Sequence, residues 1–149
     1  LIRPIKKTLI HARGCTAVKL VRKAKELGVS VVLVQSDPDM DSVAADMVRD
    51  EPEHALVCIG GNTSDESYLN ALSVLSIGEV EGVDSLHPGI GFLSEDPNFA
   101  RIVRQRSVNF IGPKVESMET MGNKSNAINT TISLDVPVVP GSYGIVETA

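Results

Sequence analysis

The chain of 149 residues is short of aromatic side chains, which make up 3% of it, and it has no tryptophan. Its core must therefore be built from Val, Ile, Leu and Ala, a composition that suits buried parallel strands covered by helices. It has no apolar run near the roughly 20 residues that span a bilayer, so we expect no membrane partner. Its net charge is −5, which provides no basic field for nucleic acid, so we expect no nucleic-acid partner.

The chain is also poor in groups that hold metals. Its two cysteines, Cys15 and Cys58, have no CxxC spacing, and its three histidines, His11, His54 and His87, are scattered. We expect no metal site, and we expect both thiols to be small buried groups in a reducing compartment. The apolar run after the basic N-terminus is too short for a signal peptide. The cytoplasm is therefore the expected location, or the mitochondrial matrix in a eukaryote.

Short β-branched runs alternate with longer stretches of helical periodicity. We expect strands at 8–12, 30–36, 55–59, 83–86 and 108–111, and helices at 16–27, 41–49, 67–77, 98–106 and 115–134. The last helix is either continuous or broken near Gly122, and the proline-rich stretch 136–140 is an edge strand at best. The alternation predicts one α/β domain over residues 1–149, a Rossmann-like, doubly wound, mainly parallel sheet with helices on both faces.

The most informative segment follows the fourth expected strand and reads H-P-G-I-G-F-L-S-E, residues 87–95. Pro88 forbids helix, and Gly89 and Gly91 allow a sharp turn. Open α/β sheets bind ligands in the loops at the carboxyl ends of their strands. The segment is therefore a candidate part of a binding site.

A dinucleotide site is the first alternative for such a fold. Its fingerprint needs G-x-G-x-x-G after the first strand, but the turn from His11 to Thr16 holds a single glycine. Asp37, at the end of the second strand, could bind a ribose hydroxyl. Without the glycines, NAD binding is disfavoured.

Several segments, in order and in register from about Lys7 to Gly141, resemble the N-terminal domain of biotin carboxylase, as found in acetyl-CoA, propionyl-CoA and pyruvate carboxylases. The family shows A-N-R-G-E, K-E-L-G, C-I-G, S-Y-L-N, H-P-G-Y-G-F-L-S-E, F-I-G-P and M-G-D-K. This chain has corresponding residues at 11–15, 25–28, 58–60, 67–70, 87–95, 110–113 and 121–124.

The resemblance implies a place in an ATP-grasp ligase. Such an enzyme activates bicarbonate with ATP and Mg²⁺ and carboxylates biotin on a carrier protein. Its partners would be the rest of the biotin carboxylase, the biotin carboxyl carrier and a carboxyltransferase, with a second copy forming a homodimer. The family's catalytic residues come from parts outside this chain. We therefore assign no catalytic residue here, expect no tightly bound cofactor, and expect residues 1–149 alone to be inactive.

The resemblance also implies roles for residues of this chain. Lys124, in the M-G-D-K match, corresponds to a nucleotide contact. Arg22 and Glu26, one helical turn apart, match dimer-interface positions, although an i,i+4 pair on a solvated face would explain them equally well. The expected wall of the cleft near biotin or bicarbonate comprises Arg13, His87, Gly89, Ile90, Gly91 and Glu95, with a strand-exit hydrogen bond as the alternative role for His87.

The chain departs from the family pattern at several motif positions, among which Cys15 replaces Glu, Ile90 replaces Tyr and Asn123 replaces Asp. These departures leave room for a non-catalytic dimerisation or interaction module that keeps only the fold. Another ATP-grasp ligase, such as carbamoyl phosphate synthetase, is a further alternative, which the H-P-G-x-G-F-L-S-E segment opposes. The sequence does not identify the substrate that accepts the carboxyl group.

Overall fold

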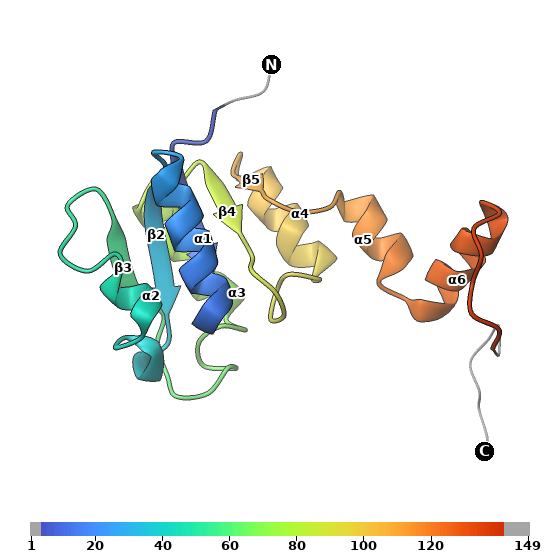
Figure 1. Ribbon diagram of the computed structural model, residues 1–149, viewed down its shortest axis with the longest axis horizontal. Coiled ribbons are helices and arrows are strands. Elements are labelled where there is room, and N and C mark those ends of the chain that lie inside the picture. The colour runs from blue at the N-terminus through green and yellow to red at the C-terminus, as the bar shows by residue number, and fades with distance from the viewer. Residues whose placement is uncertain (1–3, 142–149) are drawn as a thin grey trace. The chain divides into compact units, whose positions relative to one another are not determined.

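The structure, a computed structural model, describes residues 4–141 (Figure 1). The chain divides into two compact units, residues 1–112 and residues 113–149. Each unit is described by itself.

The first unit is built on a five-stranded sheet with the order β3-β2-β1-β4-β5, in which every pair of neighbours is parallel. The strands are β1 (Lys7–His11), β2 (Ser30–Gln35), β3 (Ala55–Cys58), β4 (Ser85–His87) and β5 (Asn109–Phe110). The central strands are apolar on both faces: Val31, Val32, Leu33 and Val34 are all fully buried. Burial on both faces is typical of a parallel sheet that is covered by helices.

The helices of this unit are α1 (Gly14–Glu26), the 3-10 turn η1 (Asp37–Asp39), α2 (Val43–Asp46), α3 (Ala71–Val80) and α4 (Pro97–Gln105). One face of the sheet packs on α1 and α2, in a core that includes Ile10, Ala17 and Ala44. The opposite face packs on α3, where a Cβ added to Gly78 would lie 3.6 Å from Leu9 (Figure 1). The predicted doubly wound parallel sheet with helices on both faces is therefore confirmed.

The second unit contains α5 (Val115–Met121) and α6 (Lys124–Ser133). The predicted last helix is therefore broken near Gly122, as one of the two expectations had it. Asn123 starts the new helix, because its Oδ1 accepts hydrogen bonds from the backbone N–H groups of Ser125 and Asn126. Residues 136–140 form no strand, which agrees with the expectation of an edge strand at best. Pro137 and Pro140 remove two of the N–H groups that a strand would need.

Two predicted helices are shorter than expected. The helix α2 covers only Val43–Asp46, and α3 begins at Ala71 rather than near Ser67. The later start of α3 has a local cause, because Asn70 Oδ1 accepts a hydrogen bond from the Ser73 N–H and so caps the helix there.

The expectation that both cysteines are buried is wrong, because Cys15 and Cys58 are both free and exposed. Cys15 lies in the first turn of α1, and Cys58 is the last residue of β3, which is the edge strand of the sheet. Among residues 4–141, no helix is long and apolar enough to cross a membrane.

Candidate functional site

The loops that follow three of the parallel strands lie at the same edge of the sheet, where the carboxyl ends of the strands are. These strands are β1, β2 and β4, which end at His11, Gln35 and His87. We call the loops that follow them, residues 12–13, 36–39 and 88–95, the carboxyl edge. Ligands of open parallel sheets bind at such an edge.

The turn at Gly89 closes directly on the end of β1. Gly89 has φ +67°, and a Cβ added there would lie 2.7 Å from both the Cβ of Ala12 and the carbonyl oxygen of His11. Only glycine allows this approach. The backbone N–H of Gly89 also donates a 3.1 Å hydrogen bond to Nδ1 of His87. Burial lowers the pKa of His87, which favours the neutral ring that can accept this bond.

Asp39 joins two of the loops through both of its carboxylate oxygens. Its Oδ1 lies 3.3 Å from Nη2 of Arg13, the residue that precedes α1. Its Oδ2 accepts hydrogen bonds of 2.8 Å from the Ser36 hydroxyl and of 2.8 Å from the Tyr68 hydroxyl. The side chain of Asp39 is 15% exposed while that of Arg13 is 53% exposed, so the guanidinium is held at the surface by a largely buried anchor.

Tyr68 is the centre of this arrangement. Its hydroxyl donates to Asp39 and accepts a 3.1 Å hydrogen bond from the buried N–H of Ser36. Its ring stacks on Phe92 with 4.7 Å between centroids, and the Arg13 guanidinium lies 5.9 Å from its centroid. Burial, followed by the effect of Asp39, raises the pKa of Tyr68 to about 12, so the phenol is a proton donor at neutral pH.

His11 lies beneath Tyr68 and is fully buried. Its Nε2 is 2.9 Å from the carbonyl oxygen of Tyr68, which can only accept, so Nε2 carries the proton. Burial lowers the pKa of His11 to about 4. The ring contacts Tyr68, Phe92 and Phe99. It is a neutral support for the carboxyl edge rather than an acid or base within it.

The other residues predicted for the cleft wall lie on the open side of the turn. Ile90 is 79% exposed, and Gly91 and Glu95 are exposed as well. The structure thus brings Arg13 to Asp39 and Gly89 to the end of β1. The roles of Ile90, Gly91 and Glu95 in a cleft stay predictions.

Lys124 belongs to the second unit, where it is the exposed first residue of α6. The side chain of Asn123 already accepts hydrogen bonds from two N–H groups of that helix end. The lysine ammonium is therefore the group that Lys124 offers to a ligand here.

Arg22 and Glu26 are exposed on α1 but do not pair with each other. Glu26 instead lies 3.0 Å from Nζ of Lys23. The i,i+4 pair that the sequence offered as an explanation is therefore absent, and the dimer contact stays a prediction.

A group of three side chains away from this edge, Glu51, Glu53 and His54, has the donor types of a metal site. The backbone N–H of Val31 donates to Nδ1 of His54, which places the proton of the neutral ring on Nε2, the atom nearer Glu51. A protonated nitrogen cannot bind a metal. Glu51 is also engaged by Lys25 at 2.6 Å, so this group makes a poor metal site.

The sequence analysis missed the parts played by His11, Asp39, Tyr68 and Phe92. A usable signal existed, because the chain has only two tyrosines and three phenylalanines. Three of these five, Tyr68, Phe92 and Phe99, surround the ring of His11. Aromatic residues placed soon after strands in a chain otherwise poor in them mark the neighbourhood of the site.

The fold and the carboxyl edge define a class of protein: a parallel α/β domain with a candidate ligand site at the carboxyl ends of its strands. The edge offers a guanidinium, a phenol and a tight glycine turn. It can orient a polar ligand, and the hydroxyls of Ser36 and Tyr68 that donate to Asp39 belong to its hydrogen-bond network.

Comparison with known proteins makes this class specific. The family described as "Biotin carboxylase, N-terminal domain" matches residues 4–118. Biotin carboxylase 1 of Bacillus subtilis is 41% identical over 143 residues, which are 96% of this chain and 31% of the relative. The chain therefore belongs to the biotin carboxylase family, as the sequence motifs indicated, and corresponds to its N-terminal domain.

Solved structures agree. The biotin carboxylase domain dimer of Hydrogenobacter thermophilus 2-oxoglutarate carboxylase, in complex with MgADP, ADP and bicarbonate, superposes with a TM-score of 0.87 at 33% identity, covering 99% of this chain and 31% of that one. The Campylobacter jejuni biotin carboxylase–ATP complex gives 0.85 at 38% identity, covering 95% and 30%. The chain thus spans about a third of the length of these relatives.

Proposed function

We propose that the chain forms the N-terminal wall of an ATP-dependent biotin carboxylase, which activates bicarbonate with ATP and carboxylates biotin on a carrier protein. The observation that carries this proposal is the carboxyl edge, where the Gly89 turn closes on the end of β1 beside Arg13. Two segments that resemble the family, one around Arg13 and one from His87 to Glu95, meet there.

The role of this wall is to position ligands rather than to perform chemistry. Asp39 and Tyr68 hold Arg13 in place, and its exposed guanidinium can bind an anion such as bicarbonate. Ile90 offers an exposed apolar surface to the ring system of biotin. Glu95 and Gly91 complete this side of the cleft.

ATP would be held through the second unit. Lys124 is exposed at the start of α6, where its ammonium can contact a phosphate as a point charge. The described residues offer no carboxylate cluster beside Lys124 for Mg²⁺, so the magnesium ligands would come from the rest of the enzyme. Magnesium would neutralise the phosphates during transfer.

The exposed face of α1 is our proposed dimer contact. Arg22 is exposed there, and Leu27 at the end of the helix is 67% exposed. An apolar groove of about 210 Å³ runs beside it, between α1 and the sheet. Its lining includes Ile5, Leu20, Leu27, Val29 and Ile111. Lys23 also lines this groove, and an apolar area rimmed by a charged residue is typical of a surface that another chain covers.

A chimera tests the proposal. This chain replaces the matching N-terminal third of Bacillus subtilis biotin carboxylase 1, and ADP release is measured with bicarbonate and free biotin. We expect a folded chimera to release ADP only when bicarbonate is present, and to lose this activity in the Arg13→Ala variant. Lys124→Gln should raise the KM for ATP more than it lowers kcat.

The chimera also distinguishes the carboxylase function from the alternative, a non-catalytic interaction module. The substitutions Cys15 and Ile90 favour a module that keeps the fold for interaction only. A folded, dimeric chimera without ATP cleavage, beside an active parent enzyme, would support that module and contradict our proposal. Bicarbonate-dependent ATP cleavage by residues 1–149 alone would contradict it as well.

The proposed partners are the remaining domains of the carboxylase, a biotin carboxyl carrier protein and a carboxyltransferase. The proposed compartment is the cytoplasm, or the mitochondrial matrix in a eukaryote. Two exposed thiols without a disulfide are stable in such a reducing compartment.

A further inference from the structure

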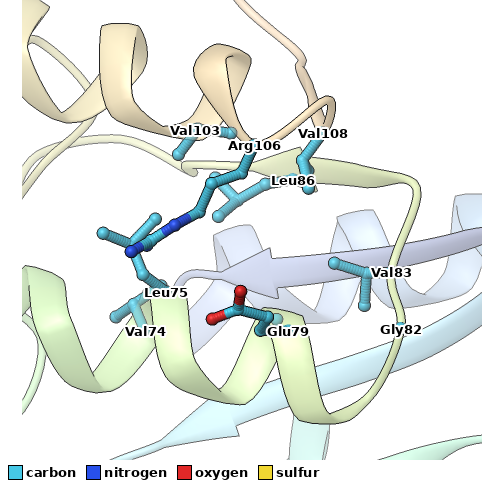
Figure 2. Close-up of a pocket in the computed structure, with 10 residues that line it drawn as sticks. Val74, Leu75, Glu79, Gly82, Val83, Leu86, Val103, Arg106 and Val108 are labelled. Atoms are coloured by element: carbon cyan, nitrogen blue, oxygen red, sulfur yellow. The ribbon is translucent and has the colours of Figure 1, made fainter.

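A second cavity lies between α3, β4 and α4, at the other end of the strands from the carboxyl edge. It is bounded by the loops that enter β4 and β5, at Gly82–Val83 and Arg106–Val108 (Figure 2). Its volume is about 200 Å³. None of the residues of the carboxyl edge lines it.

The cavity has an apolar floor. Val74, Leu75, Leu86 and Val103 supply this floor, and all four are buried. The position of Gly78 leaves α3 close to the sheet, because a Cβ there would meet Val83 at 3.4 Å. A ligand that fills this floor therefore needs an aliphatic group.

The mouth of the cavity carries two opposite charges. Figure 2 shows the Arg106 side chain extending from the end of α4 toward Leu75, and the Glu79 carboxylate rising from α3 into the same space. Both residues are exposed. Among residues 4–141, the structure places no ion-pair partner within 4.0 Å of either charge, and the two do not pair with each other.

The size of the cavity limits the ligand. Sites for drug-sized molecules usually measure about 300–1,000 Å³, and an apolar cavity of about 150 Å³ holds benzene. A volume of about 200 Å³ therefore suits a molecule of roughly ten non-hydrogen atoms.

We propose that this cavity binds a free α-amino acid with an aliphatic side chain. The carboxylate of the ligand pairs with Arg106, its ammonium pairs with Glu79, and its side chain lies on Val74, Leu75, Leu86 and Val103. A ligand with only one charge leaves the other rim charge without a partner, and a ligand without a side chain leaves the floor empty. The proposal does not rest on the carboxylase function, since it uses the opposite end of the sheet.

Ligands that each lack one group of leucine give the direct test. We use L-leucine, glycine, 4-methylpentanoate and 3-methylbutylamine, and follow backbone amide shifts of the chain in ¹H–¹⁵N spectra. We expect L-leucine to give saturable shifts at residues 74–86 and 103–108, with a Kd of the order of 1 mM. Each of the other three ligands lacks one contact and should bind at least tenfold more weakly.

Matched variants assign the two charges. Arg106→Gln should weaken L-leucine about tenfold and abolish the residual binding of 4-methylpentanoate, while Glu79→Gln should weaken L-leucine but leave 4-methylpentanoate unchanged. Lys23→Gln, on the other face of the sheet, is the control and should change nothing. If either variant fails to fold, the affinities of the four ligands for the wild-type chain still test the proposed amino acid site.

Three outcomes overturn the proposal. The first is the absence of saturable shifts up to about 20 mM L-leucine, and the second is shifts that centre outside residues 74–86 and 103–108. The third is equal affinity for L-leucine and 4-methylpentanoate, which would define a site for aliphatic carboxylates instead.

Discussion

The hydroxyl of Tyr68 donates a 2.8 Å hydrogen bond to Oδ2 of Asp39, and through it the carboxyl edge is assembled. The same hydroxyl accepts from the buried N–H of Ser36, and Asp39 holds Arg13 through its other oxygen. The phenol thus supports the ion pair between the loop after β2 and Arg13, the residue that precedes α1. The Tyr68 hydroxyl and the Ser36 hydroxyl hold Asp39, and Asp39 holds the guanidinium of Arg13.

Removing the Tyr68 hydroxyl should therefore destabilise the chain. In Tyr68→Phe the buried N–H of Ser36 loses its acceptor and Asp39 loses a donor, so we expect the free energy of unfolding to fall by about 1–3 kcal/mol. Urea denaturation followed by circular dichroism measures this change. Ser36→Ala, which removes a second donor to Asp39 but leaves the Ser36 N–H bonded, should cost less. Equal stabilities of Tyr68→Phe and wild type would show that the hydrogen bond contributes nothing.

The buried His11 should make the free energy of unfolding decrease as the pH falls. Its pKa is about 4 in the folded chain and about 6.5 when unfolded, so the unfolded chain binds more protons between these values. The stabilising contribution is complete above pH 6.5 and is lost as the pH falls toward 4. We expect the wild type to lose about 2 kcal/mol more than His11→Asn between pH 7 and about pH 5.

Urea denaturation at the two pH values measures this difference. His11→Asn is the suitable reference because the asparagine amide can still donate to the Tyr68 carbonyl and does not titrate. The remaining acid sensitivity of that variant includes the smaller share of His87, whose pKa is also lowered. Parallel loss of stability in both proteins would contradict a buried neutral His11.

The sequence predicted the parts of this structure that depend on short segments. Val-rich composition placed β2 to within one residue, and the glycines of the His87–Glu95 segment indicated a sharp turn. It could not predict the contact of Asp39 with Tyr68, which are 29 residues apart, because that contact depends on how two loops lie in the fold. The burial of Cys58 was predicted wrongly for a related reason. The sequence did not predict the strand order, and an apolar strand is partly exposed when it lies at the edge of the sheet, as β3 does.

The close approach of Gly89 to β1 gives a comparison within one loop. Gly89→Ala should destabilise the chain by about 3 kcal/mol, because the new Cβ meets Ala12 and the His11 carbonyl at 2.7 Å and φ is +67°. Gly91→Ala is the matched control. Its φ is +78° but nothing lies within 4 Å of the new Cβ, so only the backbone cost of about 1 kcal/mol applies. Thermal unfolding of both variants measures the difference, and equal losses would show that the approach of Gly89 to Ala12 relaxes at no cost.

The exposed face of α1 predicts self-association. Glu26 is occupied by Lys23, and among residues 4–141 no ion pair involves Arg22, which is exposed on α1. If this face meets a second copy, Arg22→Glu places like charges across the contact and should convert the associated chain to a monomer. Sedimentation velocity of the wild type and the variant measures this change. Arg106→Glu makes the same charge change just after α4, at the other face of the sheet, and should sediment like the wild type. A wild-type chain that is monomeric at all concentrations, or an Arg22→Glu variant that still associates, would remove α1 from the dimer contact.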